Sequence, residues 1–199
     1  FNDTATTEIY TRKIAAASDV YKRQAYSIYK LLDKVMLGAM TSMAQVGMFD
    51  NAEKIINIPT SLITAFGTVM MPRITTLLAS SDSEKISYLN RISVRYFTIL
   101  VVGAAFGLAG ISSVLAPVYF GQEFADSSVL IAGLGFSLIF VTWANVIRTQ
   151  YLIPQQLDRP YVISTLIGAV ANLAVNLVLI PRFAAVGAMT VSYTHLTLP

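Results

Sequence analysis

Cysteine is absent from this 199-residue chain, and histidine occurs once, as His195 close to the C-terminal end. The lack of cysteine excludes a disulfide framework and a thiolate active site. The sequence also contains no glycine-rich phosphate loop with its lysine, and no carboxylate cluster with metal-ligand spacing. We therefore expect no enzyme activity, no cofactor and no metal.

Charged side chains are scarce as well, at 13% of the chain compared with roughly 25% in soluble domains. Hydrophobic residues make up 55%, and the mean hydropathy is +0.62. This composition predicts an integral membrane protein. The net charge of +3 is typical of basic cytoplasmic loops, so we expect no nucleic acid as a partner.

Long stretches without charge locate the expected membrane spans. Tyr96–Gln122, Ser127–Ile147 and Tyr161–Ile180 reach the roughly 20 residues with which a helix crosses a bilayer. A shorter stretch contains Pro59 and Pro72, which are expected to kink or end a helix. The sequence thus predicts an all-α, polytopic membrane helix bundle. Its five spans are expected near residues 25–49, 55–79, 96–120, 127–147 and 161–180, with a sixth starting at 184.

The distribution of basic residues between these spans predicts their orientation. The connection at 80–95 contains three basic residues and the one at 148–160 contains two, whereas 121–126 contains none. The positive-inside rule places the first two in the cytoplasm and the third outside. The connections at 50–54 and around Arg182 then alternate onto the outer side.

The two ends of the chain differ in character from the rest. Residues 1–24 are polar and charged, and both "SDVYKRQ" near their end and "VSYTHLTLP" at 191–199 resemble translated sequencing-adapter read-through. We therefore expect 1–24 and 191–199 to be non-native segments, which leaves 25–190 to interpret. A solvated tail and a short C-terminal extension are the competing interpretations. His195 lies in the second segment and is not a candidate site.

The most informative polar residues lie in "YSIYKLLDKVMLG". On a helix, Lys30 and Asp33 share one face, and Lys34 lies one turn from Lys30. Charged side chains inside a span are costly and usually face a water-filled cavity or a partner. One interpretation is a cationic patch on a lumen, with Asp33 orienting a lysine. The other is a structural Lys30–Asp33 pair, or lysines that extend to the membrane interface.

Three further basic residues are candidates for contact with an anion. Lys54 follows Asp50 and Glu53, which alternatively form a helix capping box. Arg73 and Arg148 fit either a phosphate contact or a basic anchor at the cytoplasmic end of a span.

Asn172 and Asn176 are four residues apart, so they share one face of the helix predicted for 161–180. Asparagine on such a face makes an interhelical hydrogen bond more often than a substrate contact. Both roles are possible for this pair.

Five stretches cover most of residues 25–190: "YKLLDKVMLGAMTSMAQVGMFDNAEKI", "SLITAFGTVMMPRITTLLA", "VYFGQEFADSSVLI", "WANVIRTQYLIP" and "GAVANLAVNLVLIPRFAAVGA". In this order they resemble bacterial Wzx-type polysaccharide flippases of the multidrug/oligosaccharidyl-lipid/polysaccharide exporter superfamily. The resemblance implies part of the C-terminal lobe of a MATE-like transporter, in which two lobes surround a central cavity. It places the chain from the seventh span to the start of the twelfth.

The resemblance also implies a function. An undecaprenyl-diphosphate-linked oligosaccharide repeat unit would be flipped across the bacterial plasma membrane, for capsule, exopolysaccharide or O-antigen synthesis. Alternating access through a cationic cavity is the implied mechanism. Asp33 would couple to a cation or hold a lysine. The implied headgroup contacts are Lys30, Lys34, Lys54, Arg73 and Arg148.

The implied partners are the lipid-linked oligosaccharide, membrane lipids, and the polysaccharide polymerase and chain-length machinery. Three competing functions stay open. A lipid II flippase differs in its sugar, and a drug/cation antiporter of the same superfamily would need an acidic cavity. A non-transport scaffold of an envelope assembly complex would not need lysines in a lumen.

Overall fold

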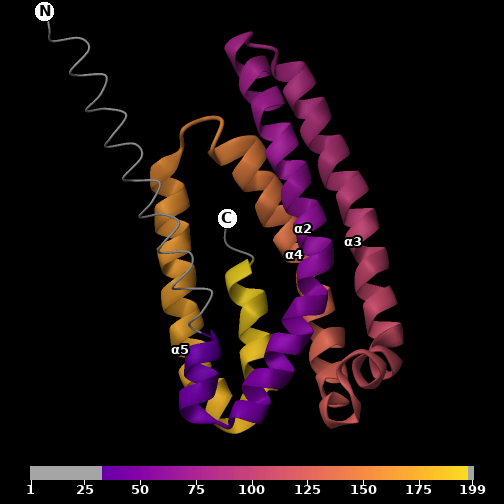
Figure 1. Cartoon of the computed structure of the whole chain (residues 1–199). Coiled ribbons are helices and arrows are strands. Elements are labelled where there is room, and N and C mark those ends of the chain that lie inside the picture. The colour runs from indigo at the N-terminus through magenta and orange to yellow at the C-terminus, as the bar shows by residue number, and fades with distance from the viewer. Residues whose placement is uncertain (1–32, 197–199) are drawn as a thin grey trace, which may run out of the picture.

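The computed structural model describes residues 33–196, and these residues form helices without any strand (Figure 1). Residues 33–40 are helical and lead to a break at Thr41 and Ser42. The elements that follow are α2 (Met43–Ala79), α3 (Ser83–Phe120), the 3₁₀ turn η1 (Gln122–Phe124), α4 (Ser127–Ile147), the π-helical turn η2 (Arg148–Leu152) and α5 (Asp158–Leu196).

Four helical stretches in this part of the chain are long and apolar enough to cross a membrane. They are Met43–Ala79, Ser83–Phe120, Ser127–Leu152 and Arg159–Val191. The predicted all-α, polytopic helix bundle is confirmed. The span expected at 127–147 has the bounds of α4, whereas the span expected at 25–49 begins outside the described residues.

The first connection between helices lies at 41–42 and not at the expected 50–54. The chain breaks at Thr41–Ser42, and α2 then runs without interruption through the charged residues that follow. The charges do not end the helix because Asp50 and Lys54, four residues apart, form an ion pair along it. The connection expected at 80–95 is also shorter, because α3 begins at Ser83.

Prolines do not end the helices that contain them. α2 continues through Pro59 and Pro72, and α3 continues through Pro117. Of the two outcomes expected for Pro59 and Pro72, α2 does not end at either one, and it bends part-way along its length in Figure 1. Hydroxyl groups close to each proline of α2 hydrogen-bond backbone carbonyls, as Thr60 does with Ile56 at 2.8 Å. Such helix-internal contacts help a membrane helix to tolerate proline.

The connections gather at two opposite ends of the bundle. Figure 1 places the α2–α3 turn and the α4–α5 connection at one end, and η1 and the sharp turn within α5 at the other. This is the alternation that the basic residues predict, with both basic connections on the same side. The positive-inside rule predicts that the end with the two basic connections faces the cytoplasm.

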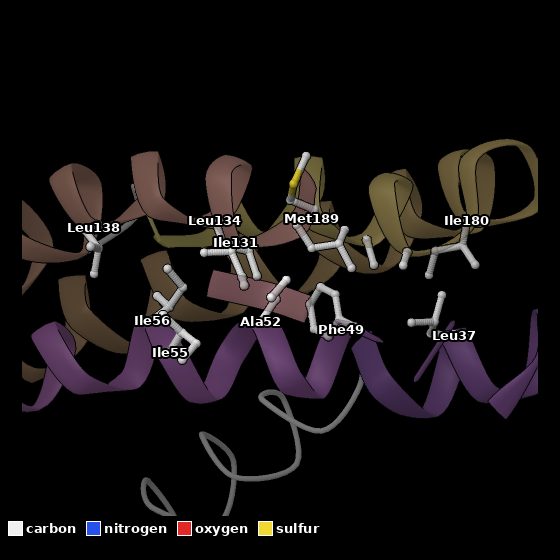
Figure 2. Packing of buried hydrophobic residues seen from close by; sticks show 14 of the residues in the cluster. Leu37, Phe49, Ala52, Ile55, Ile56, Ile131, Leu134, Leu138, Ile180 and Met189 are labelled. Carbon is white, nitrogen blue, oxygen red and sulfur yellow. The ribbon is translucent and has the colours of Figure 1, made fainter. Parts of the chain in front are cut away.

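α4 lies at the centre of the packing and contacts α2, α3 and α5. Figure 2 shows Leu37, Phe49 and Ala52 on one side of a hydrophobic cluster, with side chains of α4 and α5 on the other. Phe49 and Ile131 are fully buried there. Many apolar side chains elsewhere on the four helices are exposed, which suits helices that face lipid.

α5 consists of two helical legs joined at Ala184, which has φ 50° and ψ −129°. A residue with a side chain rarely adopts such a positive φ. Gly187 lies just beyond, where an added Cβ would be 2.5 Å from the carbonyl oxygen of Leu179. The two legs therefore approach so closely that the backbone itself forms the contact.

Substitutions at this turn should have opposite effects on stability. Ala184→Gly should stabilise the protein by about 1–3 kcal/mol, because glycine adopts positive φ without strain. Gly187→Ala should destabilise it by about 1–3 kcal/mol, because the Leu179 carbonyl blocks the new methyl group. Melting temperatures in detergent of the product of the full-length gene would test both. Equal melting temperatures for the two variants would contradict this geometry.

Asp82 caps α3 and should make its stability depend on pH. Its carboxylate pairs with the Lys85 ammonium at 2.6 Å and accepts a bond from the Lys85 backbone N–H at 3.1 Å. These bonds lower the pKa of Asp82 below its usual 3.8. The native pKa is thus below the unfolded one, so the stabilisation is present above the unfolded value and is lost as pH falls through the native value.

Asp82→Ala should accordingly lower the melting temperature at neutral pH, and the difference from the unaltered protein should shrink in acid. Glu84→Ala is the matched control, since Glu84 is exposed and lies in the same helical turn. A pH-independent difference for Asp82→Ala would exclude the carboxylate as the cause.

Candidate functional site

Four charged side chains form a compact ion-pair cluster, which we call the charge cluster: Lys34, Asp50, Glu53 and Lys54. The Lys34 ammonium lies 2.6 Å from Asp50 Oδ1 and 2.8 Å from Glu53 Oε2. The other oxygen of Asp50 lies 3.0 Å from the Lys54 ammonium. Asp50 therefore bridges both lysines, and the cluster carries no net charge.

The local sequence explains why these four groups meet. Asp50, Glu53 and Lys54 have helical spacings of three and four residues, so they share one face of α2. Lys34 lies on helical residues 33–40, which the break at 41–42 folds back beside the start of α2.

The charge cluster lies within the helical part of the bundle but keeps some exposure. The exposed fractions of the side chains are 26% for Lys34, 37% for Asp50, 22% for Glu53 and 61% for Lys54. Gly47, one turn before Asp50, faces Phe124 of η1. The cluster thus lies near the end of the bundle that holds the 121–126 connection, which is the predicted outer end.

A second polar group lies beside the first and is almost completely buried. Asp33 Oδ1 accepts hydrogen bonds from the side-chain amides of Asn172 at 3.0 Å and Asn176 at 2.6 Å. Asn176 also donates to Asn172 Oδ1 at 3.0 Å. Asp33 is 5% exposed and both asparagines are 0% exposed. These bonds join residues 33–40 to α5 across about 140 positions of sequence.

The neighbours Asp33 and Lys34 therefore belong to different polar groups. Lys34 faces α2, whereas Asp33 faces α5. The two asparagines do make interhelical hydrogen bonds, the more common of the two roles considered for them. Lys30 lies outside the described residues.

The two predicted arginines lie away from the charge cluster. Arg73 is 19 residues beyond Lys54 on α2, which is roughly 28 Å along a helix. It is exposed and forms no ion pair with the described residues. Arg148 begins the π-helical turn η2, and its Nε is buried without a hydrogen-bond partner in the part of the chain that the structure describes. The predicted cations thus do not form one site.

The turn η2 contains Gln150, which belongs to a cluster of side-chain amides at 145–156 of the sequence but is not among the predicted site residues. Gln150 is 1% exposed, and neither of its amide atoms has a hydrogen-bond partner among the described residues. Nearby, Gly67 of α2 approaches Asn145 and Thr149 so closely that a side chain there would collide with both. π-helical turns inside α-helices are frequent at functional positions. The amide cluster in the sequence was the available signal, but it fits an exposed loop equally well.

Asp50 and Glu53 are two more site residues that the sequence did not assign. Their spacing suggested a capping box at a helix start, whereas α2 begins at Met43. The usable signal was the Lys54–Asp50 spacing, which predicts a pair along a helix. Nothing local predicts the contact of either carboxylate with Lys34.

Known proteins resemble this chain over most of its length. The family model described as "Lipid II flippase MurJ" matches residues 25–197. The chain belongs to the MurJ family. Flippases are transporters, which agrees with the expectation that the protein is not an enzyme. The Wzx type named by the resemblance remains a prediction. A non-native origin of the two ends also remains a prediction; the MurJ match begins at residue 25 and includes residues 191–197.

Three curated relatives come from archaea. The "Probable low-salt glycan biosynthesis flippase Agl15" of Haloferax volcanii is 24% identical over 166 residues, 80% of this chain and 34% of the relative. The "Probable flippase AglR" of the same organism is 28% identical over 190 residues, 90% of this chain and 37% of the relative.

The "Uncharacterized membrane protein MJ1068" of Methanocaldococcus jannaschii is 26% identical over 160 residues, 79% of this chain and 31% of the relative. The chain therefore spans about a third of the length of these relatives. No solved structure matches it.

Removing the buried carboxylate should destabilise this MurJ-family segment more than removing an exposed one. Asp33→Ala leaves the amides of Asn172 and Asn176 without their acceptor, at a cost of about 2–5 kcal/mol. Asp33→Asn keeps an oxygen acceptor and should cost less. The measurement is the melting temperature of the full-length gene product in detergent.

Asp126→Ala is the control for this experiment, because Asp126 is exposed in the connection before α4. Should Asp33→Ala and Asp126→Ala melt at the same temperature, the buried hydrogen bonds would not contribute to stability.

Proposed function

We propose that this chain is part of a flippase that moves a lipid-linked glycan with a diphosphate headgroup across the cell membrane. Membership of the MurJ family and the names of two relatives as flippases support the transport class. The observation that carries the proposal to the level of residues is the charge cluster. Two lysines on neighbouring helical segments, Lys34 partly buried and Lys54 exposed, provide donors of the kind that a phosphate group requires.

The physical problem is to move a diphosphate and its sugars through hydrocarbon. Leaving water costs an ion so much free energy that the protein must replace the lost hydration with charged and polar groups. We assign Lys34 and Lys54 to the headgroup, together with Lys30. Arg73 and Arg148 lie toward the predicted cytoplasmic end and suit contacts made when the substrate enters.

Alternating access fits the arrangement of these residues. The arginines lie toward one end of the bundle and the lysines toward the other, so a substrate would meet them in succession as the cavity changes its opening. Asp33 is the candidate for coupling to an ion or for positioning a lysine. In its described contacts it holds two asparagines of α5, so movement of α5 would alter its surroundings.

Two glycan classes fit the proposal. The family description favours lipid II, whereas the name of one relative favours an oligosaccharide used in glycan synthesis. The substrate proposed from the sequence, an undecaprenyl-diphosphate-linked repeat unit at a bacterial plasma membrane, shares its diphosphate with lipid II. The polysaccharide polymerase and chain-length machinery are proposed partners for the repeat-unit case alone.

An antiporter and a scaffold without transport activity have less support than a flippase. An antiporter for cationic drugs would need carboxylates available to a cation, whereas Asp50 and Glu53 are both engaged by lysines. A scaffold gives no reason for a partly buried lysine that two carboxylates neutralise between helical segments.

Neutralising both lysines of the charge cluster should abolish most transport. In the full-length gene, Lys34→Gln with Lys54→Gln should lower export of the lipid-linked glycan by roughly tenfold or more, since two charged contacts to the headgroup are lost. The glutamines can still donate hydrogen bonds to Asp50 but no longer neutralise the two carboxylates, so the melting temperature and the protein level of the variant are measured alongside transport. Lys85→Gln is the control, because Lys85 is exposed at the start of α3.

The readout is growth or surface polysaccharide in two host strains, one depleted of its lipid II flippase and one lacking its repeat-unit flippase. Rescue of one strain by the unaltered gene identifies the glycan class. Rescue by the double variant at normal protein level would exclude the two lysines from the transport path.

A further inference from the structure

The two carboxylates of the charge cluster occupy the positions that an anionic substrate would need. Asp50 and Glu53 place oxygens 2.6 and 2.8 Å from the Lys34 ammonium, which are the distances of charge-assisted hydrogen bonds. Asp50 also engages Lys54 through its second oxygen. In this state neither lysine is a free cation, so a phosphate group would have to displace at least one carboxylate.

We infer that Asp50 and Glu53 are exchangeable counter-ions, which hold Lys34 and Lys54 between transport cycles and give way to the diphosphate of the substrate. This inference rests on the proposed function and adds two residues and a competition step to it. The step is an exchange of ion pairs in which no covalent bond changes.

The charges balance in both states. A diphosphate that carries a lipid on one side and a sugar on the other has two ionised oxygens near neutral pH, which equals the charge of Asp50 plus Glu53. Exchanging one pair of anions for the other leaves both lysines compensated. Lys34 is partly buried, so leaving it without any anion would carry part of the cost of a buried, unpaired charge.

The exposure of the side chains allows the exchange. Asp50 and Glu53 are 37% and 22% exposed, so neighbouring atoms do not enclose them and each has space to turn away when the lysines move to the substrate. The same carboxylates compete for the lysines afterwards, and this competition favours release of the headgroup. Lysine–carboxylate and lysine–diphosphate pairs of comparable strength thus suit a transporter, which must both bind and release its substrate.

The two carboxylates should contribute unequally. Asp50 contacts both lysines, whereas Glu53, within the part of the chain that the structure describes, contacts Lys34 alone. Removing the charge of Asp50 therefore frees more of the cationic surface than removing the charge of Glu53. This order distinguishes the specific exchange from a general change in electrostatic potential.

The test measures binding of undecaprenyl diphosphate, which has the same diphosphate group with one additional ionisable oxygen at its free end, to the full-length gene product in detergent. Asp50→Asn, Glu53→Gln and their combination keep the shape of each side chain but remove its charge. The combined variant should bind roughly three- to tenfold more tightly and release the lipid more slowly, since it removes partly exposed ion pairs that compete with the ligand. Asp50→Asn alone should have a larger effect than Glu53→Gln alone.

Glu84→Gln is the matched control, because it removes one exposed carboxylate from α3 and should leave the dissociation constant unchanged. Melting temperatures of all variants report whether each one folds. An unchanged or weaker affinity in a folded combined variant would overturn the exchange and leave Asp50 and Glu53 as structural partners of the lysines.

A further variant separates this inference from the proposed function. If Lys34→Gln with Lys54→Gln loses the lipid but neutralising the carboxylates does not tighten binding, the lysine site stands and the exchange is wrong. If the lysine variant binds undecaprenyl diphosphate as well as the unaltered protein, the proposed headgroup site fails, and the exchange fails with it.

Discussion

A charge inside a membrane span must be compensated nearby, because hydrocarbon offers it neither water nor mobile ions. The first part of the described chain is arranged around this requirement. Lys34 is neutralised by Asp50 and Glu53, so residues 33–40 fold back along α2 instead of continuing away from it. The charges of α2 remain inside a continuous helix for the same reason. Without Lys34, the charge cluster would have only Lys54 to balance two carboxylates among the described residues.

The same requirement joins the start of the described chain to its last helix. Asp33 is almost fully buried, and two asparagine amides of α5 satisfy one of its oxygens. Adjacent residues thus fix residues 33–40 to two different helices, through ion pairs on one side and amides on the other. Apolar packing of Leu37 against the central cluster completes this arrangement. A transporter benefits from such a junction, since a change at one polar group is transmitted to the elements held by the other.

Much of the fold could be predicted because long apolar runs in the sequence identify membrane helices. The bounds of α4 and the turn between the legs of α5 lie where the charge-free runs end. The connections at 50–54 and 80–95 could not be placed in this way. Charged residues also occur inside helices when partners neutralise them, and one of the two partners of Asp50, Lys34, is 16 residues away. The charge content of a stretch is therefore an imperfect guide to where a membrane helix ends.

The features of the candidate site likewise fall into those that local sequence predicts and those that depend on the packing of helices. The sequence by itself determined the membrane class, the helical character of the spans and the shared face of Asn172 and Asn176, because these depend on composition or on neighbours within one helix turn. Only the tertiary structure decided that Lys34 faces Asp50 and Glu53, that Asp33 faces α5, and that Arg73 and Arg148 lie elsewhere. Those contacts depend on how separate helices pack against each other, and no local pattern of residues records that packing.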